Sequence, residues 1–293
     1  MEMLYLKIEN HFREKVYYES VPLPFNYTHY DFLIQPIFNN RSAYCLNVPV
    51  FYVIRSHPDK TEERYFIRTT WAANLKNSII FVLGRPESSA SWKIINQESS
   101  IYGDLLVIDM LDSYKNLSIK SVAILRWISR FCHAPSFFFQ GDPDVAVFTT
   151  SVSDVLKTKD NKVPRIYGYC WESALVFRDG RNKWSMKHSI YSSYTYPRYV
   201  AGAAWMFSPA VPAMLLQVLN TPRPYFHIDD VLITGLLAER ANIPRECIGG
   251  VGYPHDFYDI TKCVNPPLMA IFQLTQAQIL NALKKVKQGI LKC

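Results

Sequence analysis

The sequence predicts an α/β domain built around a mostly parallel sheet. Short apolar segments typical of buried strands recur between residues 48 and 148, and helix-length segments separate several of them. Strands that alternate with helices favour a parallel sheet with helices packed on its faces. The composition agrees, because 49% of the 293 residues are hydrophobic and 19% are charged, which is typical of a globular chain.

The first expected elements are a strand and a helix that follow one another closely. We expect a strand over Val48–Ile54 and a helix over Asp59–Trp71. Asp59 is the expected N-cap, because acidic residues fill the turn that follows it. Two further apolar runs, Ser78–Leu83 and Leu105–Met110, are expected as strands.

Next along the chain, an amphipathic helix is expected over Asn116–Phe131 and a strand over Ser136–Gln140. Val145–Phe148 is again strand-like, and an apolar run over Val231–Leu237 is expected to be helical. No internal repeat or low-complexity tract is visible. We therefore expect one α/β domain whose C-terminal part is more irregular.

The N-terminal region differs in character from the rest. Residues 1–44 show no clear periodicity, and we expect a stem-like extension there, followed by a single domain over residues 45–293. N-x-S/T sequons occur at Asn26, Asn40 and Asn116, which favours the secretory route weakly, since such triplets arise by chance.

Cysteine spacing leaves two readings open. None of the six cysteines forms a C-x-x-C pair, so a structural zinc site is not expected. Their wide separation suits a few disulfides in an oxidising compartment, and buried free thiols are an equal alternative.

Charge and hydropathy exclude several classes of function. The formal charge is +7, but no zinc-finger spacing or basic-aromatic motif supports nucleic-acid binding. A phosphate-bearing small molecule fits this charge as well as a solvated surface does. No apolar run of about 18 residues is present, so association with a membrane would need an anchor that this chain lacks.

The first candidate site is the turn Asp142-Pro143-Asp144, which follows an apolar strand. Ligands in parallel sheets bind at the carboxyl ends of the strands. Two carboxylates at this spacing can hold a hard cation, which in turn can bridge the oxygens of a diphosphate. The alternative is a solvated turn, which is the more common fate of an isolated Asp-x-Asp.

The second candidate is the pair Asp229-Asp230 before the apolar run. A carboxylate there could be a general base that takes the proton of an attacking sugar hydroxyl. It could equally cap a helix, where the macrodipole favours acidic residues. The small residues within Tyr196–Ser208 would let a ligand approach closely, and a turn packed against a strand is the alternative.

Several motifs occur in an order that resembles a known family. They are Arg64, Ile67, Arg68, Thr70 and Trp71; Phe81 to Gly84; Tyr102 to Asp104; Asp112 to Lys120; Asp142 to Val147; Lys183 and Trp184; Tyr196 to Gly202; and Asp229 to Val231 with Gly235. This set resembles the β1,3-galactosyltransferases and β1,3-N-acetylglucosaminyltransferases of glycosyltransferase family 31, from about Cys45 to Cys293. The N-acetylglucosaminyl branch looks slightly closer.

The resemblance implies an inverting enzyme of the GT-A fold, located in the Golgi apparatus, that uses a UDP-sugar and Mn²⁺. It implies Asp144 as the metal ligand and Asp230 as the base. Asp142 and Asp229 would lie on the donor side of the site. Arg68 and Lys120 fall in motifs near the nucleotide, where a structural ion pair is an equal alternative.

The chain departs from the family pattern at three positions. Pro143 replaces the middle aspartate, Gln140 replaces a preceding lysine, and Phe272 stands where the family has a metal-binding histidine. His255 is the nearest histidine upstream that could replace it, and an unrelated loop residue is the alternative. We therefore expect a β1,3-hexosyltransferase acting on glycans or glycoproteins, with a catalytically weakened glycan-binding or folding-assistant protein as the alternative.

Overall fold

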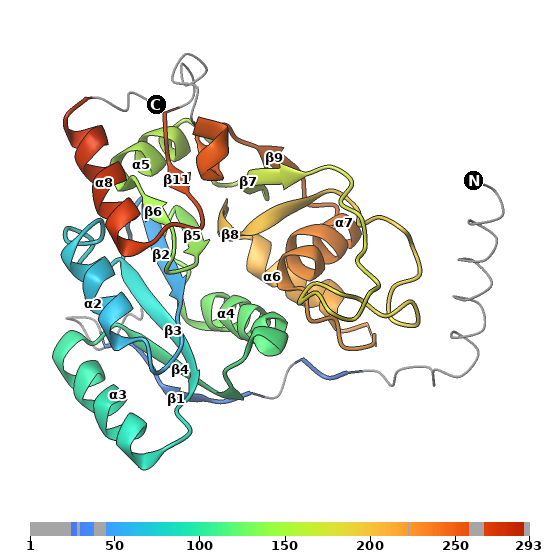
Figure 1. Ribbon diagram of the computed structural model, residues 1–293, viewed down its shortest axis with the longest axis horizontal. Coiled ribbons are helices and arrows are strands. Elements are labelled where there is room, and N and C mark those ends of the chain that lie inside the picture. The colour runs from blue at the N-terminus through green and yellow to red at the C-terminus, as the bar shows by residue number, and fades with distance from the viewer. Residues whose placement is uncertain (1–24, 28–29, 38–44, 222, 258–266, 290–293) are drawn as a thin grey trace.

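The computed structural model describes residues 25–27, 30–37, 45–221, 223–257 and 267–289 of the chain (Figure 1). Their strands are β1 (Phe32–Ile34), β2 (Val50–Arg55), β3 (Ile79–Arg85), β4 (Leu105–Leu111), β5 (Phe137–Gly141), β6 (Ala146–Val147), β7 (Ile166–Trp171), β8 (Tyr199–Phe207), β9 (Arg245–Cys247), β10 (Val251–Gly252) and β11 (Ala270–Ile271). Their helices are α2 (Thr61–Thr69), α3 (Ser89–Tyr102), η1 (Tyr114–Asn116), α4 (Leu117–Phe131), α5 (Thr149–Lys157), α6 (Val211–Leu219), η2 (Val231–Leu237), α7 (Ala238–Arg240), η3 (Pro254–Phe257) and α8 (Gln276–Lys287).

The main sheet has eight strands in the order β1-β4-β3-β2-β5-β8-β7-β9. Strands β4, β3, β2 and β5 are parallel neighbours, and β7 is parallel to β9. The remaining pairings, β1 with β4 and β8 with both β5 and β7, are antiparallel. The predicted α/β class with a mostly parallel sheet is confirmed.

Helices cover both faces of this sheet. Figure 1 shows α2, α3 and α8 on one side of the strands and α4, α6 and α7 on the other. The two hydrophobic cores follow this division, with Phe138 of β5 in the core beneath α4 and Phe139 in the core beneath α2. Successive side chains of a strand point to opposite faces, so the continuous apolar runs of the sequence are those of doubly covered strands.

The N-terminal boundary differs from the prediction. β1 pairs with β4 as an edge strand, and Tyr27 is buried against the domain. Residues 25–27 and 30–37 therefore belong to the domain rather than to a separate stem, because their side chains and backbone complete its sheet and core. Residues 1–24 of the predicted extension and the sequon at Asn40 lie outside the described residues.

Two helix predictions need correction. Lys60 rather than Asp59 is the N-cap of α2, and the backbone N–H of Asp59 donates to His57 instead. Helix α3 was not expected, because only Ile95 and Glu98 of it are buried and no apolar stripe marks it. Its caps are local, and Gly103 ends it in the left-handed conformation at φ 66°.

The C-terminal half is regular rather than irregular. It supplies β7, β8 and β9 of the main sheet, and β10 and β11, which form a small sheet with β6. The segment Tyr196–Ser208, for which a turn was the alternative, consists mostly of the nine-residue strand β8. Gly202 of this strand lies against Asp230, the residue that precedes η2.

Disulfides join Cys45 to Cys132 and Cys170 to Cys247. This decides between the two readings of the cysteines for four of the six, while Cys263 and Cys293 lie outside the described residues. In the described part of the chain, no helix is both long and apolar enough to cross a bilayer.

Candidate active site

The site begins where β2 and β5 end. Their parallel register pairs Ile54 with Gly141, so Arg55 and Asp142 come out side by side at the carboxyl edge of the sheet. This is the edge at which parallel sheets bind ligands. The fold therefore brings an arginine to the acidic turn, although no motif in the sequence points to Arg55.

Arg55 is buried and fully engaged. Its Nε donates to Asp142 at 2.8 Å, and one terminal nitrogen lies 2.7 Å from the same carboxylate and donates to the carbonyl oxygen of Gly202 at 2.7 Å. The other terminal nitrogen donates to Asp229. Burial by itself would lower the pKa of Arg55, but the Asp142 and Asp229 carboxylates raise it, so the guanidinium is a fixed cation at the centre of the acidic residues.

Asp229 and Asp230 reach this point from the residues that precede η2. Asp229 accepts from Arg55 and from the hydroxyl of Ser121 at 2.8 Å, so its carboxylate is committed to these two partners. Asp230 instead accepts from the backbone N–H of Val231 at 2.8 Å and of Gly202 at 3.1 Å. Both predicted readings of the pair therefore apply, because Asp230 caps η2 and also lies in the site.

Asp230 is held close to β8. A Cβ atom on Gly202 would lie 3.1 Å from the Cβ of Asp230, which is tighter than ordinary packing allows. Glycine at this position lets Asp230 approach the strand without a displacement, which gives Gly202 a packing reason.

The environment of Asp230 suits proton transfer. Burial and the neighbouring Asp229 charge raise the pKa of Asp230 to about 7. Burial also raises the pKa of Asp142, to about 6, against the opposing charge of Arg55. A carboxyl group whose pKa lies near neutral pH is a stronger base than an exposed aspartate and is still ionised for much of the time.

Asp144 is the exposed member of the acidic turn. Its backbone carbonyl accepts from the N–H of Leu274 at 2.9 Å, which ties the turn to the C-terminal segment. The other carboxylate of the turn, Asp142, is paired with Arg55, whereas Asp144 forms no ion pair among the described residues. Asp144 is thus the turn residue whose carboxylate can still bind a ligand.

Lys120 lies at the same edge, but its ammonium group donates its hydrogen bonds to other protein groups. Its ammonium is buried, donates to both carboxylate oxygens of Asp112 at 2.6 and 2.8 Å, and donates to the Ser56 carbonyl at 2.9 Å. Burial lowers the pKa of Lys120, and Asp112 opposes this effect. Its contacts fit the structural alternative rather than direct contact with a donor.

Arg68 lies at the opposite edge of the sheet. It forms a two-pronged ion pair with Asp104, which precedes β4, and a second ion pair with Glu98. In a β-α-β unit the helix runs back along the sheet, so the C-terminal end of α2 is far along the strands from the end of β2. These ion pairs and this position fit the structural alternative for Arg68 better than contact with a donor.

The two residues considered as a histidine ligand behave differently. Phe272 is fully buried and packs edge-to-face against Tyr253 at 5.2 Å between ring centroids. His255 is exposed, stacks on Tyr253 and lies 3.5 Å from Asp256. The described contacts tie His255 to its own short helix, so they favour the reading of an unrelated loop residue.

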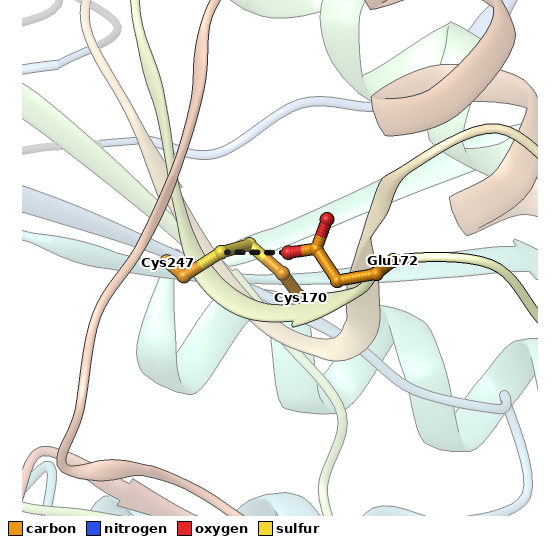
Figure 2. A group of neighbouring side chains, drawn as sticks. All are labelled: Cys170, Glu172 and Cys247. Carbon is orange, nitrogen blue, oxygen red and sulfur yellow. Dashed lines mark hydrogen bonds between the residues drawn. A yellow bond between two sulfur atoms is a disulfide. The ribbon is translucent and has the colours of Figure 1, made fainter.

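Metal-binding geometry is limited at the acidic turn. Within the described ranges, the three ligand-type residues that come together are Cys170, Glu172 and Cys247, and Figure 2 shows that the two sulfur atoms are bonded to each other. A disulfide offers no thiolate, so this group is not a metal site. At the turn, Asp144 offers one hard oxygen ligand, which fits a cation whose other ligands are phosphate oxygens and water.

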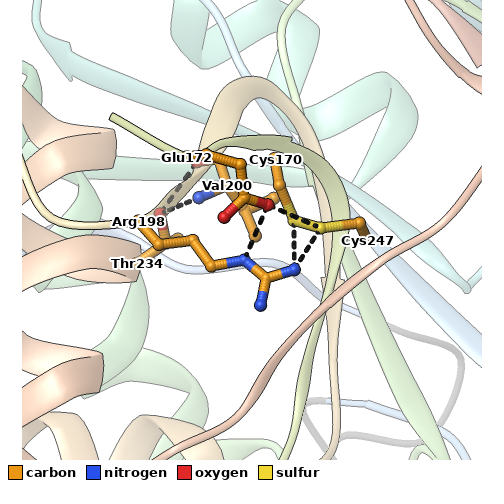
Figure 3. The surroundings of a disulfide bond; sticks show 6 residues. All are labelled: Cys170, Glu172, Arg198, Val200, Thr234 and Cys247. Carbon is orange, nitrogen blue, oxygen red and sulfur yellow. Dashed lines mark hydrogen bonds and ion pairs between the residues drawn. A yellow bond between two sulfur atoms is a disulfide. The ribbon is translucent and has the colours of Figure 1, made fainter. Parts of the chain in front are cut away.

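The disulfide between β7 and β9 lies beside Arg198, which is two residues before Val200 on the neighbouring strand β8 (Figure 3). Arg198 forms an ion pair with Glu172 at 3.1 Å beside the sulfur atoms. Two residues later the N–H of Val200 donates to the hydroxyl of Thr234 at 2.9 Å, and that hydroxyl lies 2.8 Å from the carbonyl oxygen of Asp230. The turn that carries Asp230 is therefore fixed to β8 through a buried hydroxyl.

The sequence of this chain is similar to a known protein family and to several of its members. Residues 62–248 match the sequence profile of the galactosyltransferase family. This chain belongs to that family. Over 209 residues it is 30% identical to β-1,3-galactosyltransferase 5 of Pan paniscus, covering 69% of each chain, and to the Homo sapiens protein of the same name, covering 69% of this chain and 67% of that one. It is 28% identical over 228 residues to β-1,3-galactosyltransferase 1 of Mus musculus, covering 75% and 68%.

The family resemblance predicted from the motifs is confirmed, and the chain is a glycosyltransferase. Among solved structures, it is similar to the galactosyltransferase LgtC in complex with donor and acceptor sugar analogues. That similarity has a TM-score of 0.44 and 11% identity, and it covers 80% of this chain and 95% of the other.

Proposed function

We propose that the protein is an inverting β1,3-glycosyltransferase of the GT-A type that transfers galactose from a UDP-sugar to a hydroxyl of a glycan or glycoprotein. The observation that carries the proposal is the position of Asp230. This carboxylate has a pKa of about 7, accepts from the N–H of Gly202 and follows Asp229, which is paired with Arg55. Galactose is preferred over N-acetylglucosamine because the similar proteins named above are galactosyltransferases. Such a role belongs to protein glycosylation in the Golgi apparatus.

In the proposed reaction, Asp230 accepts the proton of the acceptor hydroxyl as its oxygen attacks the anomeric carbon. The new bond forms on the face opposite the leaving group, and the bond to the diphosphate breaks, so the configuration inverts and UDP leaves. A sugar hydroxyl is a weak nucleophile, and removal of its proton in the transition state contributes typically about 10²–10⁴-fold. Asp142, whose carboxylate is paired with Arg55, would lie beside the nucleotide side of the donor rather than bind the cation.

Mn²⁺ is the proposed cofactor, with Asp144 as its protein ligand. When bound, the cation would neutralise charge on the departing diphosphate. The exposed Asp144 carboxylate supports this assignment, whereas Asp142 and Asp229 are occupied by Arg55. We infer that the donor supplies most of the remaining ligands, because hard cations of this type are commonly held by one or two carboxylates together with substrate phosphates.

The proposal is tested by measuring UDP release with UDP-galactose and UDP-N-acetylglucosamine over a panel of acceptors with Mn²⁺. We expect acceptor-dependent release with one donor, and its loss in the Asp230→Asn variant. Asp154→Asn is the matched control, since this exposed aspartate on α5 pairs with Lys157 away from the site. No release with any donor and acceptor pair would contradict the proposal.

A second function is favoured by the small number of free ligands at the turn. With Pro143 in the acidic motif and Phe272 buried among aromatic rings, the protein could act as a glycan-binding or folding-assistant relative that does not turn over. Calorimetry separates the two functions. Binding of UDP-sugar in the micromolar range supports the enzyme, and absence of binding with or without Mn²⁺ supports the second function.

A further inference from the structure

A single buried arginine connects every segment of the candidate site. Arg55 ends β2, and its guanidinium contacts Asp142 after β5, Gly202 in β8 and Asp229 before η2. Its side chain is 4% exposed, whereas that of the ion-paired Arg85 at the end of the neighbouring strand β3 is 51% exposed. Four elements far apart in the sequence are thus joined at one planar group.

These contacts occupy all the N–H donors of the Arg55 guanidinium. Nε and both terminal nitrogens donate to the acidic residues or to Gly202, and a longer contact of 3.5 Å reaches Ser121. No donor is left that points to a substrate, so Arg55 does not act by binding phosphate. The planar guanidinium donates hydrogen bonds in fixed directions and so can orient two carboxylates relative to each other. The ammonium group of a lysine has no such fixed geometry.

Arg55 also controls where Asp230 lies. Gly202 donates its N–H to Asp230 and accepts from Arg55 with its carbonyl, so the two contacts fix opposite ends of one glycine residue. Asp229, the neighbour of Asp230, is held by Arg55 on the other side. The base is therefore positioned from two directions by a group that it does not touch in any described contact.

The charges explain why the cluster needs a cation. Asp229 is buried and Asp142 is partly buried, and two such neighbouring carboxylates without a counter-charge would repel one another and lose hydration. The nearby Lys120 does not compensate them, because it is paired with Asp112. Gln140 of β5 lies two residues before Asp142, on the same face of the sheet. It carries no charge to balance the carboxylates, and neither of its amide atoms has a hydrogen-bond partner among the described residues.

We infer that Arg55 is a positioning residue of the transfer reaction, and that its fork aligns Asp142 and Asp230 with each other across the site. The inference rests on the proposed function, since it concerns the geometry of that reaction. It goes beyond the acidic motifs, because it assigns the alignment to a basic residue outside them.

The test compares Arg55→Met and Arg55→Lys with the unsubstituted protein in kcat per folded molecule and in melting temperature. Loss of alignment of about 1 Å typically costs about 10²-fold in rate, so we expect kcat to fall by about that factor in Arg55→Met. Arg55→Lys keeps the charge but not the fork. We expect it to melt close to the unsubstituted protein and still lose about tenfold in kcat.

Arg85→Met is the matched control and should keep full activity, because Arg85 pairs with Asp109 at the surface. If Arg55→Lys keeps the unsubstituted kcat, or if the kcat of Arg55→Met per folded molecule is unchanged, the inference is overturned and Arg55 has only a stabilising role. If Arg55→Met does not fold, Arg55→Lys still decides between these results. Absence of transfer by the unsubstituted protein would overturn the proposed function, and the inference with it.

Discussion

At the residue scale, the site is a set of carboxylates with different surroundings. Asp142 and Asp229 share one guanidinium, Asp230 is held by backbone N–H groups, and Asp144 is exposed. The same residue type therefore serves different purposes, because hydrogen-bond partners and burial set the charge and basicity of each. Two predictions concern Asp230 directly.

The first prediction is that Asp230→Asn lowers kcat by about 10²–10⁴-fold, the usual contribution of a general base. The amide keeps the size of the side chain and its capping oxygen, so the protein should still fold and bind UDP. Steady-state kinetics and UDP calorimetry on the same preparation check this. Full turnover by the variant would remove Asp230 from the proposed mechanism.

The second prediction concerns pH. A base must be ionised to accept a proton, and the pKa of Asp230 is about 7, so kcat should rise as pH increases through about 7. Stability has the opposite sign. Below the folded pKa and above the usual aspartate value the folded state binds the extra proton, so this group's contribution to stability falls as pH rises from about 4 to 7.

Asp230→Asn removes that penalty. At pH 8 the variant should melt at a higher temperature than the unsubstituted protein, and the difference should shrink towards pH 4. Melting curves across this range, with Asp154→Asn as the control, are the measurement. If the difference in melting temperature between the variant and the unsubstituted protein is more negative at pH 8 than at pH 4, then ionised Asp230 does not destabilise the folded protein.

At the element scale, η2 and β8 decide where the base lies. η2 is a π-helix, a form that occurs mostly in short stretches and frequently at functional sites. The buried hydroxyl of Thr234 contacts the backbone of Val200 on β8 and of Asp230. This one side chain therefore joins the helix to the strand next to the site.

The third prediction is that Thr234→Val destabilises the protein by about 1–3 kcal/mol, because it leaves the buried N–H of Val200 without its partner at almost unchanged volume. It should also lower kcat, since the Asp230 carbonyl loses its contact. Denaturant unfolding and kinetics check the two effects. Thr234→Ser retains the hydroxyl and is the control that should keep most of the activity.

At the scale of the whole molecule, the sheet gathers the site from segments over 170 residues apart, as the contact of Arg55 with Asp229 shows. The proposed metal site is the least complete part, because Asp144 is its proposed protein ligand and Phe272 stands where the family resemblance predicts a histidine. In the proposed function, oxygen atoms of the substrate would supply the remaining ligands.

The fourth prediction is that Mn²⁺ binds tightly only together with UDP. Calorimetry with Mn²⁺ alone should give weak binding, and addition of UDP should tighten it, since the diphosphate supplies oxygen ligands that the protein lacks. Asp144→Asn should abolish this increase, whereas Asp154→Asn should not. Equal Mn²⁺ affinity with and without UDP would point to protein ligands other than Asp144.

The strands that build the site could be predicted from the sequence, because their apolar runs report burial on both faces. The sequence also predicts Asp142, Asp144 and Asp230 as candidate site residues, from their spacing and from the order in which the family motifs occur. Arg55 could not be, although it directly follows an apolar run, because one arginine after a strand carries no local signal of what it will contact. Helix α3 was missed for a related reason, since its stability comes from caps and from two buried residues.

The sequence alone thus determined the α/β class, the family and the residues that could carry the chemistry, since these depend on local patterns and on motif order. Tertiary structure decided which of those residues meet. It placed Arg68 at the far edge of the sheet, enclosed Lys120 with Asp112, and set Arg55 between Asp142 and Asp229. The physical reason is that ion pairing and burial depend on distances across strands and helices, which residue order along the chain does not specify.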